Sequence, residues 1–114
     1  MSDKPTVKDC AMYRMLRTGD IKGFNARKAS GEKVDLTHCD FRHVDLRNLH
    51  ADGLDFTGSY FRQADLRGLD LRNTCLDGAS IHNARISGAY FPTELSPEEI
   101  QLSFQHGTRL RYKT

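Results

Sequence analysis

Residues 64–73 read ADLRGLDLRN, which is one five-residue unit followed by a second unit of the same design. The same phase continues in both directions and covers residues 34–93, giving twelve units without an insertion. The third position of a unit is a large apolar residue in eleven of the twelve, with Ala51 as the exception. The middle of the chain is therefore a repeat of period five.

A period of five predicts short extended pieces joined by corners, because it matches neither an amphipathic helix nor a long strand. Side chains alternate along an extended backbone. The first and third positions of each unit are therefore expected to point inward, and the second and fourth outward. The fifth position is His, Asn, Gly, Gln or Thr and is expected at the corner, where Gly and Asn suit unusual backbone angles.

The units resemble the A(D/N)LxX signature of the pentapeptide-repeat family, and residues 64–68 match it at every position. The resemblance implies an all-β repeat fold, a right-handed quadrilateral β-helix with four pentapeptides in each coil and short α-helical caps at both ends. Residues 34–93 would then form about three coils. Residues twenty apart would stack at the spacing of a β-sheet, ~4.8 Å. A fold of this kind says little about function by itself.

The two flanks of the repeat are expected to close the ends of the β-helix, which would otherwise expose unpaired backbone groups. The predicted organisation is an N-terminal helical cap or arm in residues 1–33, the repeat in residues 34–93, and a C-terminal helix with a short tail in residues 94–114.

Helix signals are present in the N-terminal flank. Thr6 and Asp9 resemble a capping box, and Gly19 is expected to end the helix that follows them. Asp20 is the expected N-cap of a second short helix. Phe24 of that helix is expected to plug the open end of the first coil.

The C-terminal flank predicts one more helix. Ser96 is its expected N-cap, with Pro97 at the first helical position and Glu99 at the third, and Gly107 would end it. The apolar residues of this flank either cap the third coil or form a homodimer, since members of the family often dimerise through C-terminal hydrophobic residues. These residues are Ile100, Leu102, Phe104, Leu110 and Tyr112.

The composition favours a cytoplasmic protein without a membrane partner. No apolar run approaches the length of a membrane span, and the first residues lack the apolar stretch of a signal peptide. The three cysteines are then expected to be free thiols. The net charge of +2 is uneven, because residues 1–33 hold eight Lys or Arg against four Asp or Glu, whereas residues 34–93 hold six against eight.

No residue pattern predicts catalysis, cofactor binding or a metal site. The chain has no Gly-rich phosphate loop and no recognisable catalytic triad. His38 and His43 fall on neighbouring corners of one coil, too far apart to share an ion at ~2 Å bond lengths. Cys39 points inward, and Cys75 lies among aspartates that disfavour a thiolate. The expectation is a non-enzymatic protein.

The outward positions divide into four faces when the units are taken by fours. We call face one the outward residues of the units that begin at 34, 54 and 74, and faces two, three and four those of the units that follow. Face one carries three aspartates and no cation, a net of −3, which a basic segment such as the N-terminal arm or a partner would have to cover. The aspartates predicted to bind a partner are Asp35, Asp55 and Asp77.

Face two is the second predicted recognition surface. It offers Arg42, Tyr60 and Arg62, and these residue types are favoured at protein interfaces. Face three alternates Asp and Arg, which is most simply a solvated set of ion pairs.

The first functional hypothesis is a protein-interaction or scaffold module that presents flat faces to an unidentified protein. The alternative is DNA mimicry, as in the gyrase-binding members of the family, although those resemble long acidic rods. A third hypothesis is nucleic-acid binding through the outward arginines, against which the interleaved aspartates argue because they repel phosphates. The arginines concerned are Arg42, Arg47, Arg62, Arg67 and Arg72.

Overall fold

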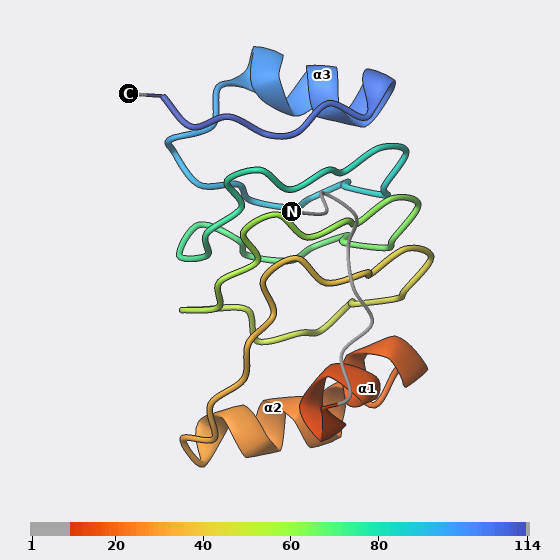
Figure 1. Ribbon diagram of the computed structural model, residues 1–114, viewed down its shortest axis with the longest axis vertical. Coiled ribbons are helices and arrows are strands. Elements are labelled where there is room, and N and C mark those ends of the chain that lie inside the picture. The colour runs from red at the N-terminus through yellow and green to blue at the C-terminus, as the bar shows by residue number, and fades with distance from the viewer. Residues whose placement is uncertain (1–9, 114) are drawn as a thin grey trace.

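The computed structural model describes residues 10–113, which form a stack of coils with helices at its two ends (Figure 1). Helix α1 (Ala11–Thr18) and helix α2 (Ile21–Ala29) lie together at the end where the repeat begins. Helix α3 (Pro97–His106) lies at the opposite end, and the tail after it runs back across the last coil.

Neighbouring coils pair through parallel β-bridges, and every bridge joins two residues twenty positions apart. Twenty residues are four pentapeptides, so the predicted stacking is confirmed, and residues 34–53, 54–73 and 74–93 are the first, second and third coils. No segment of residues 10–113 forms a continuous strand, because a corner interrupts the extended backbone after every three residues. The bridges are Asp40–Tyr60, Asp45–Asp65, Asp55–Cys75, Tyr60–Ser80, Asp65–Arg85 and Asp70–Tyr90.

The corners are tight turns centred on the fourth and fifth positions. The carbonyl of a third-position residue accepts a hydrogen bond from the first N–H of the next unit, as in Leu69 N to Leu66 O at 3.2 Å. From position 38 to position 88 every fifth residue has a positive φ except Asn73. A positive φ at the third of four turn residues is the signature of a type II turn. The fifth residues that adopt it without being glycine are His38, His43, Asn48, Gln63 and Asn83.

The inward side chains fill the stack, which confirms the predicted alternation. Phe41 and Phe61 lie twenty residues apart and stack with their ring centroids 5.2 Å apart. Phe56 meets both rings edge-on, and Tyr13 of α1 packs edge-on against Phe41, so aromatic packing runs from the cap into the second coil. The core retains a void of about 10 Å³, room for at most one water.

The helices of the N-terminal cap begin and end largely as their sequence predicts. Gly19 ends α1 with φ +88°, and the Asp20 carboxylate accepts a hydrogen bond from an N–H of the first turn of α2 at 3.0 Å. The N-cap of α1 is Cys10, whose extended backbone precedes Ala11, and not Thr6. Thr6 and Asp9 lie outside the described residues.

The N-terminal cap also satisfies backbone groups of the first coil. Phe24 is fully buried, as expected of a plug. The Tyr13 hydroxyl donates to the carbonyl oxygen of Asp40 at 2.6 Å, and the Asn25 amide donates to the carbonyl oxygen of Asn48 at 3.0 Å. The cap therefore replaces, with side-chain bonds, part of the pairing that a preceding coil would supply.

The predicted ends of α3 are confirmed. Ser96 accepts a hydrogen bond from the N–H of Glu99 at 3.1 Å, and Pro97 occupies the first helical position. Gly107 ends the helix with φ +73°.

The C-terminal tail adds an edge to the third coil. Leu110 is fully buried; its N–H donates to the Ala79 carbonyl, and its own carbonyl accepts from the Gly78 N–H, both at 2.7 Å. The Tyr112 hydroxyl accepts from the N–H of Leu76 at 2.8 Å. Of the two roles predicted for this flank, Leu110 and Tyr112 therefore serve the cap.

Candidate interaction faces

Most outward arginines are paired with an aspartate of their own pentapeptide. The second and fourth residues of a unit point to the same side, so an Asp-x-Arg unit places a carboxylate beside a guanidinium. In four units the Nε and Nη2 atoms donate to the two carboxylate oxygens at 2.7–3.0 Å, a geometry we call the fork. The forks are Asp40–Arg42, Asp45–Arg47, Asp65–Arg67 and Asp70–Arg72.

The forks hold their carboxylates ionised. Hydrogen bonds from Arg67 lower the pKa of Asp65 to about 2, and those from Arg72 lower the pKa of Asp70 to about 2. The pKa values of the other two fork aspartates are lowered for the same reason. Exposed pairs of this kind add little stability each. Their main consequence is that both charges are cancelled within one unit.

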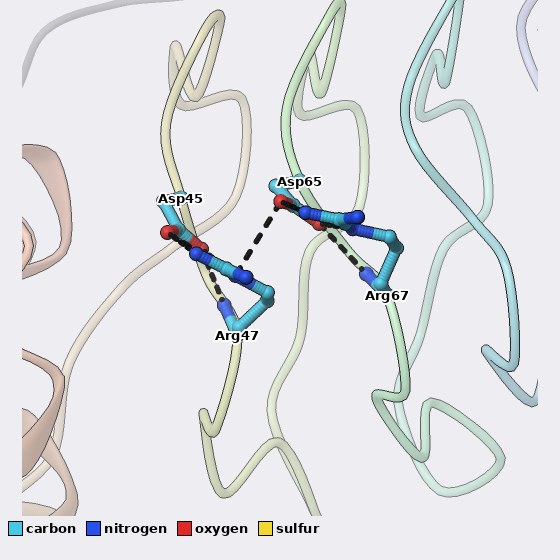
Figure 2. A network of polar contacts seen from close by, with 4 residues as sticks. All are labelled: Asp45, Arg47, Asp65 and Arg67. Carbon is cyan, nitrogen blue, oxygen red and sulfur yellow. Dashed lines mark hydrogen bonds and ion pairs between the residues drawn. The ribbon is translucent and has the colours of Figure 1, made fainter.

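On the first two coils of face three, such pairs lie side by side (Figure 2). Two forks lie on neighbouring coils, and Arg47 also reaches across to the Asp65 carboxylate, with its Nε 3.4 Å from Oδ2. The prediction of an ion-paired face is confirmed for these two coils. On the third coil, Arg85 has no aspartate in its unit, and no fork cancels its charge.

Two of the three aspartates of face one are used in local turns. The Asp35 carboxylate accepts from the N–H and hydroxyl of Thr37 at 3.0 and 2.6 Å, and Asp55 accepts from Thr57 at 3.0 and 2.5 Å. A role of these aspartates and of Asp77 in binding a partner stays a prediction. The N-terminal arm and a partner were the two candidates for covering this face, and the first nine residues of the arm lie outside the described residues.

Five units carry an arginine at the fourth position, and four of them have an aspartate at the second position. The fifth lies on face two, where Tyr60 takes the place of the aspartate and Arg62 is the arginine. The Arg62 guanidinium lies 5.8 Å from the centroid of the Tyr60 ring. Its Nε is buried without a hydrogen-bond partner, and no ion pair within residues 10–113 includes Arg62. A Cβ on Gly107 would lie 2.8 Å from its Nη2, so the guanidinium also packs against the tail.

A polar groove of about 370 Å³ follows the corner between faces two and three. It is built from two stacked columns, the fourth and fifth positions of successive coils. No carboxylate lines it. Its lining residues are Arg42, His43, Arg62, Gln63, His82 and Asn83. The predicted residues Arg42 and Arg62 therefore share one groove, with Tyr60 beside it.

The third group of predicted contacts, on α3, is only partly used by the cap. Ile100 and Phe104 are half-buried against the coils, and they line an apolar groove of about 440 Å³ together with Ile86. Leu102 is 40% exposed. Of the predicted dimer surface, Ile100, Leu102 and Phe104 thus remain accessible to a second chain, whereas Leu110 and Tyr112 are engaged with the third coil.

The remaining metal-binding and thiol side chains are dispersed over the described part of the chain. No three His, Cys, Asp or Glu side chains within residues 10–113 gather closely enough to hold a metal ion. Cys39 is buried, and the Cys75 sulfur lies 3.1 Å from the Thr57 hydroxyl. Across the same described range, no helix is both long and apolar enough to cross a membrane.

The tail contributes a cation to face two that sequence reasoning did not place there. Arg109 lies 5.1 Å from the centroid of the Tyr60 ring, and its Nη2 donates to the Tyr60 hydroxyl at 3.1 Å. From the other cap, Arg17 donates to the carbonyl oxygen of Arg42 at 3.0 Å. Each cap thus places one arginine beside the outward residues of face two, Arg17 at Arg42 and Arg109 at Tyr60.

The comparisons with known proteins agree with the repeat. A family model described as pentapeptide repeats matches eight copies over residues 20–49 and 50–91, more than half of the chain. Neither the comparison with curated proteins nor that with solved structures gives a match. With its bridges at a separation of twenty and its corners at every fifth residue, the chain belongs to the pentapeptide-repeat family.

Proposed function

We propose that this chain is a non-enzymatic interaction module, a short right-handed quadrilateral β-helix that presents face two to a protein partner. The observation that supports it most is Arg62, which is held against Tyr60 and Gly107 without a counter-ion, whereas the other fourth-position arginines are neutralised by forks. Charged groups are seldom left unpaired when they are partly buried.

The coil supports such a role because it fixes the positions of its outward side chains. The Tyr60 N–H donates to the Cys39 carbonyl, and the Tyr60 carbonyl accepts from the Phe41 N–H, so both backbone groups are bound to the first coil. The residues on either side of Tyr60 are bonded to Ser80 of the third coil. Arginine and tyrosine anchors on a rigid surface lose little conformational entropy when they bind.

Affinity purification from native extract tests the proposal. The tagged chain is compared with Tyr60→Ala and Arg62→Ala, and the matched controls are Tyr90→Ala and Arg72→Ala on face four. Face two is supported if at least one co-purifying protein is lost with both face-two variants and kept with both controls. The same set of proteins with all five baits would refute the assignment.

A homodimer through the C-terminal segment is our second proposal. It is favoured by the exposed Leu102 and by the apolar groove that Ile86, Ile100 and Phe104 line. Sedimentation over a range of protein concentrations tests it. A dimer is expected to dissociate in Leu102→Asp, and a monomer at every concentration of the parent chain would rule it out.

The forks weaken the two alternatives carried over from the sequence. A DNA mimic needs rows of uncompensated carboxylates, and a nucleic-acid binder needs rows of uncompensated cations, but four Asp-x-Arg units cancel both. Inhibition of gyrase supercoiling by a stoichiometric amount of this chain would restore the mimicry hypothesis.

A further inference from the structure

We infer that the groove between faces two and three binds an acidic peptide segment, with Arg62 as the cation that recognises its carboxylates. The inference rests on the proposed function and names the chemistry of the partner. Its basis is one exception to a rule. Every other outward arginine at a fourth position has an aspartate two residues earlier, and Arg62 has Tyr60.

Tyrosine in place of aspartate at position 60 removes the carboxylate that would neutralise Arg62, and the positive charge of Arg62 remains. At Arg42 on the same face, the neighbouring carboxylate accepts two side-chain bonds, at 2.9 and 2.7 Å. At Arg62 the ring of Tyr60 and the backbone of Gly107 hold the guanidinium, and neither accepts a hydrogen bond from it. A carboxylate supplied by a ligand would complete the site as Asp40 completes its neighbour.

The surroundings of Arg62 also favour an anion. The groove is lined by two arginines, two histidines and two side-chain amides, with no carboxylate among them. The Asp40 carboxylate on this face is already engaged by Arg42. Side-chain amides and guanidinium groups supply N–H donors that match carboxylate oxygens.

A peptide fits better than a nucleic acid. Nucleic acids gain affinity from several phosphates contacted in line. On one side of face two lies face one, with three aspartates and no cation. On the other side, Arg47 and Arg67 of face three are in forks, and Arg85 is the one arginine of that face outside them. A continuous phosphate backbone would therefore meet repulsion or cancelled charge beyond the groove, whereas a short acidic segment needs to place only one or two carboxylates beside Arg62.

The test is fluorescence anisotropy with a fluorescein-labelled octaglutamate peptide at ~0.15 M salt, where exposed charges farther apart than ~8 Å are largely screened. The variants are Arg62→Gln, which removes no internal hydrogen bond, and Tyr60→Asp, which restores the aspartate of the fork. Each is expected to weaken binding about tenfold or more, the effect of one lost charge-assisted hydrogen bond. Thermal unfolding checks that both variants remain folded.

The controls are matched in charge and in position within the pentapeptide. Arg72→Gln and Tyr90→Asp change the net charge by the same amounts on face four, and binding is expected to stay within about twofold of the parent chain. Equal losses in all four variants would show attraction by net charge alone and overturn the inference. So would labelled oligothymidine of equal charge that binds as tightly and depends equally on Arg62.

The peptide-binding experiment and the affinity purification can refute the acidic ligand and the proposed function independently of each other. If octaglutamate does not bind but a purified partner is still lost with Arg62→Ala, face two recognises a partner of another chemistry and only the acidic ligand is wrong. If no partner depends on face two, the proposed function itself is refuted.

Discussion

Replacing Gly58 with alanine tests how tightly the coils are stacked at their corners. Gly58 is a fifth-position residue of the second coil, with φ +70°, and its N–H donates to the Asp77 carbonyl at 2.9 Å. A Cβ at this position would lie 2.3 Å from Nδ1 of His38, the corner residue one coil below. Alanine must therefore adopt a left-handed backbone and also displace an imidazole.

A second corner separates the two costs. Gly68 lies on the same coil with φ +75°, and a Cβ there would meet no atom within 4 Å. Gly68→Ala is expected to lose about 1 kcal/mol for the left-handed backbone alone. Gly58→Ala is expected to lose about 2–4 kcal/mol, because overpacking adds about 1–3 kcal/mol.

Urea unfolding followed by circular dichroism measures both free energies. The double variant His38→Ala/Gly58→Ala completes a double-mutant cycle. In the absence of the imidazole ring, the destabilisation caused by Gly58→Ala should be smaller by at least about 1 kcal/mol. A loss in Gly58→Ala within about 0.5 kcal/mol of that in Gly68→Ala would show that the imidazole turns aside freely, and the reasoning on tight corner stacking would fail.

Three further outcomes are expected. Tyr112→Phe should lose about 1–3 kcal/mol in urea unfolding, because the Leu76 N–H loses its acceptor, and an unchanged midpoint would show that the tail does not cap the coil. Phe41→Ala should lose about 3–5 kcal/mol by opening a cavity in the aromatic core, and a loss below about 1 kcal/mol would mean that the core collapses around it. The folded-state pKa of Asp65 is about 2, below its unfolded value of ~3.9, so its contribution is present above ~pH 4 and is lost as the pH falls towards 2. Stability measured between pH 4 and pH 2 should therefore fall less steeply in Asp65→Asn than in the parent chain, and parallel curves would refute the shift.

Most of the fold could be predicted because each pentapeptide repeats the same pattern of inward, outward and corner residues. The inward alternation, the stacking at twenty residues and the helix ends at Gly19, Asp20 and Ser96 all follow from residues close together in the chain. The start of α1 after Cys10 was missed, because Cys10 makes no side-chain cap hydrogen bond that a sequence pattern could signal. The period of five also predicted that the extended pieces stay short, as the isolated bridges show.

The capping role of the flanks was predicted, but most of the individual residue pairs that join them to the repeat were not. Arg109 and Tyr60 are 49 residues apart, and nothing in either segment's pattern specifies where the tail crosses the third coil. The forks, in contrast, were within reach. An Asp and an Arg two positions apart on one extended piece must lie side by side. That rule would have marked Arg62 from the sequence as the arginine without an aspartate.

Departures from a repeat can be sorted by whether the fold itself uses them. Ser59 replaces a small apolar residue at an inward position, and it is fully buried, with its hydroxyl donating to the Leu36 carbonyl at 2.6 Å and accepting from the Cys39 N–H at 3.0 Å. Its polar group is satisfied, so packing explains it. Tyr60, the next residue, leaves Arg62 without a hydrogen-bond acceptor and so worsens the internal pairing. Tyr60 also anchors the tail, because its hydroxyl accepts a hydrogen bond from Arg109 at 3.1 Å. The fold therefore accounts for the tyrosine but leaves the Arg62 guanidinium without an acceptor, and a carboxylate of an external ligand would supply one.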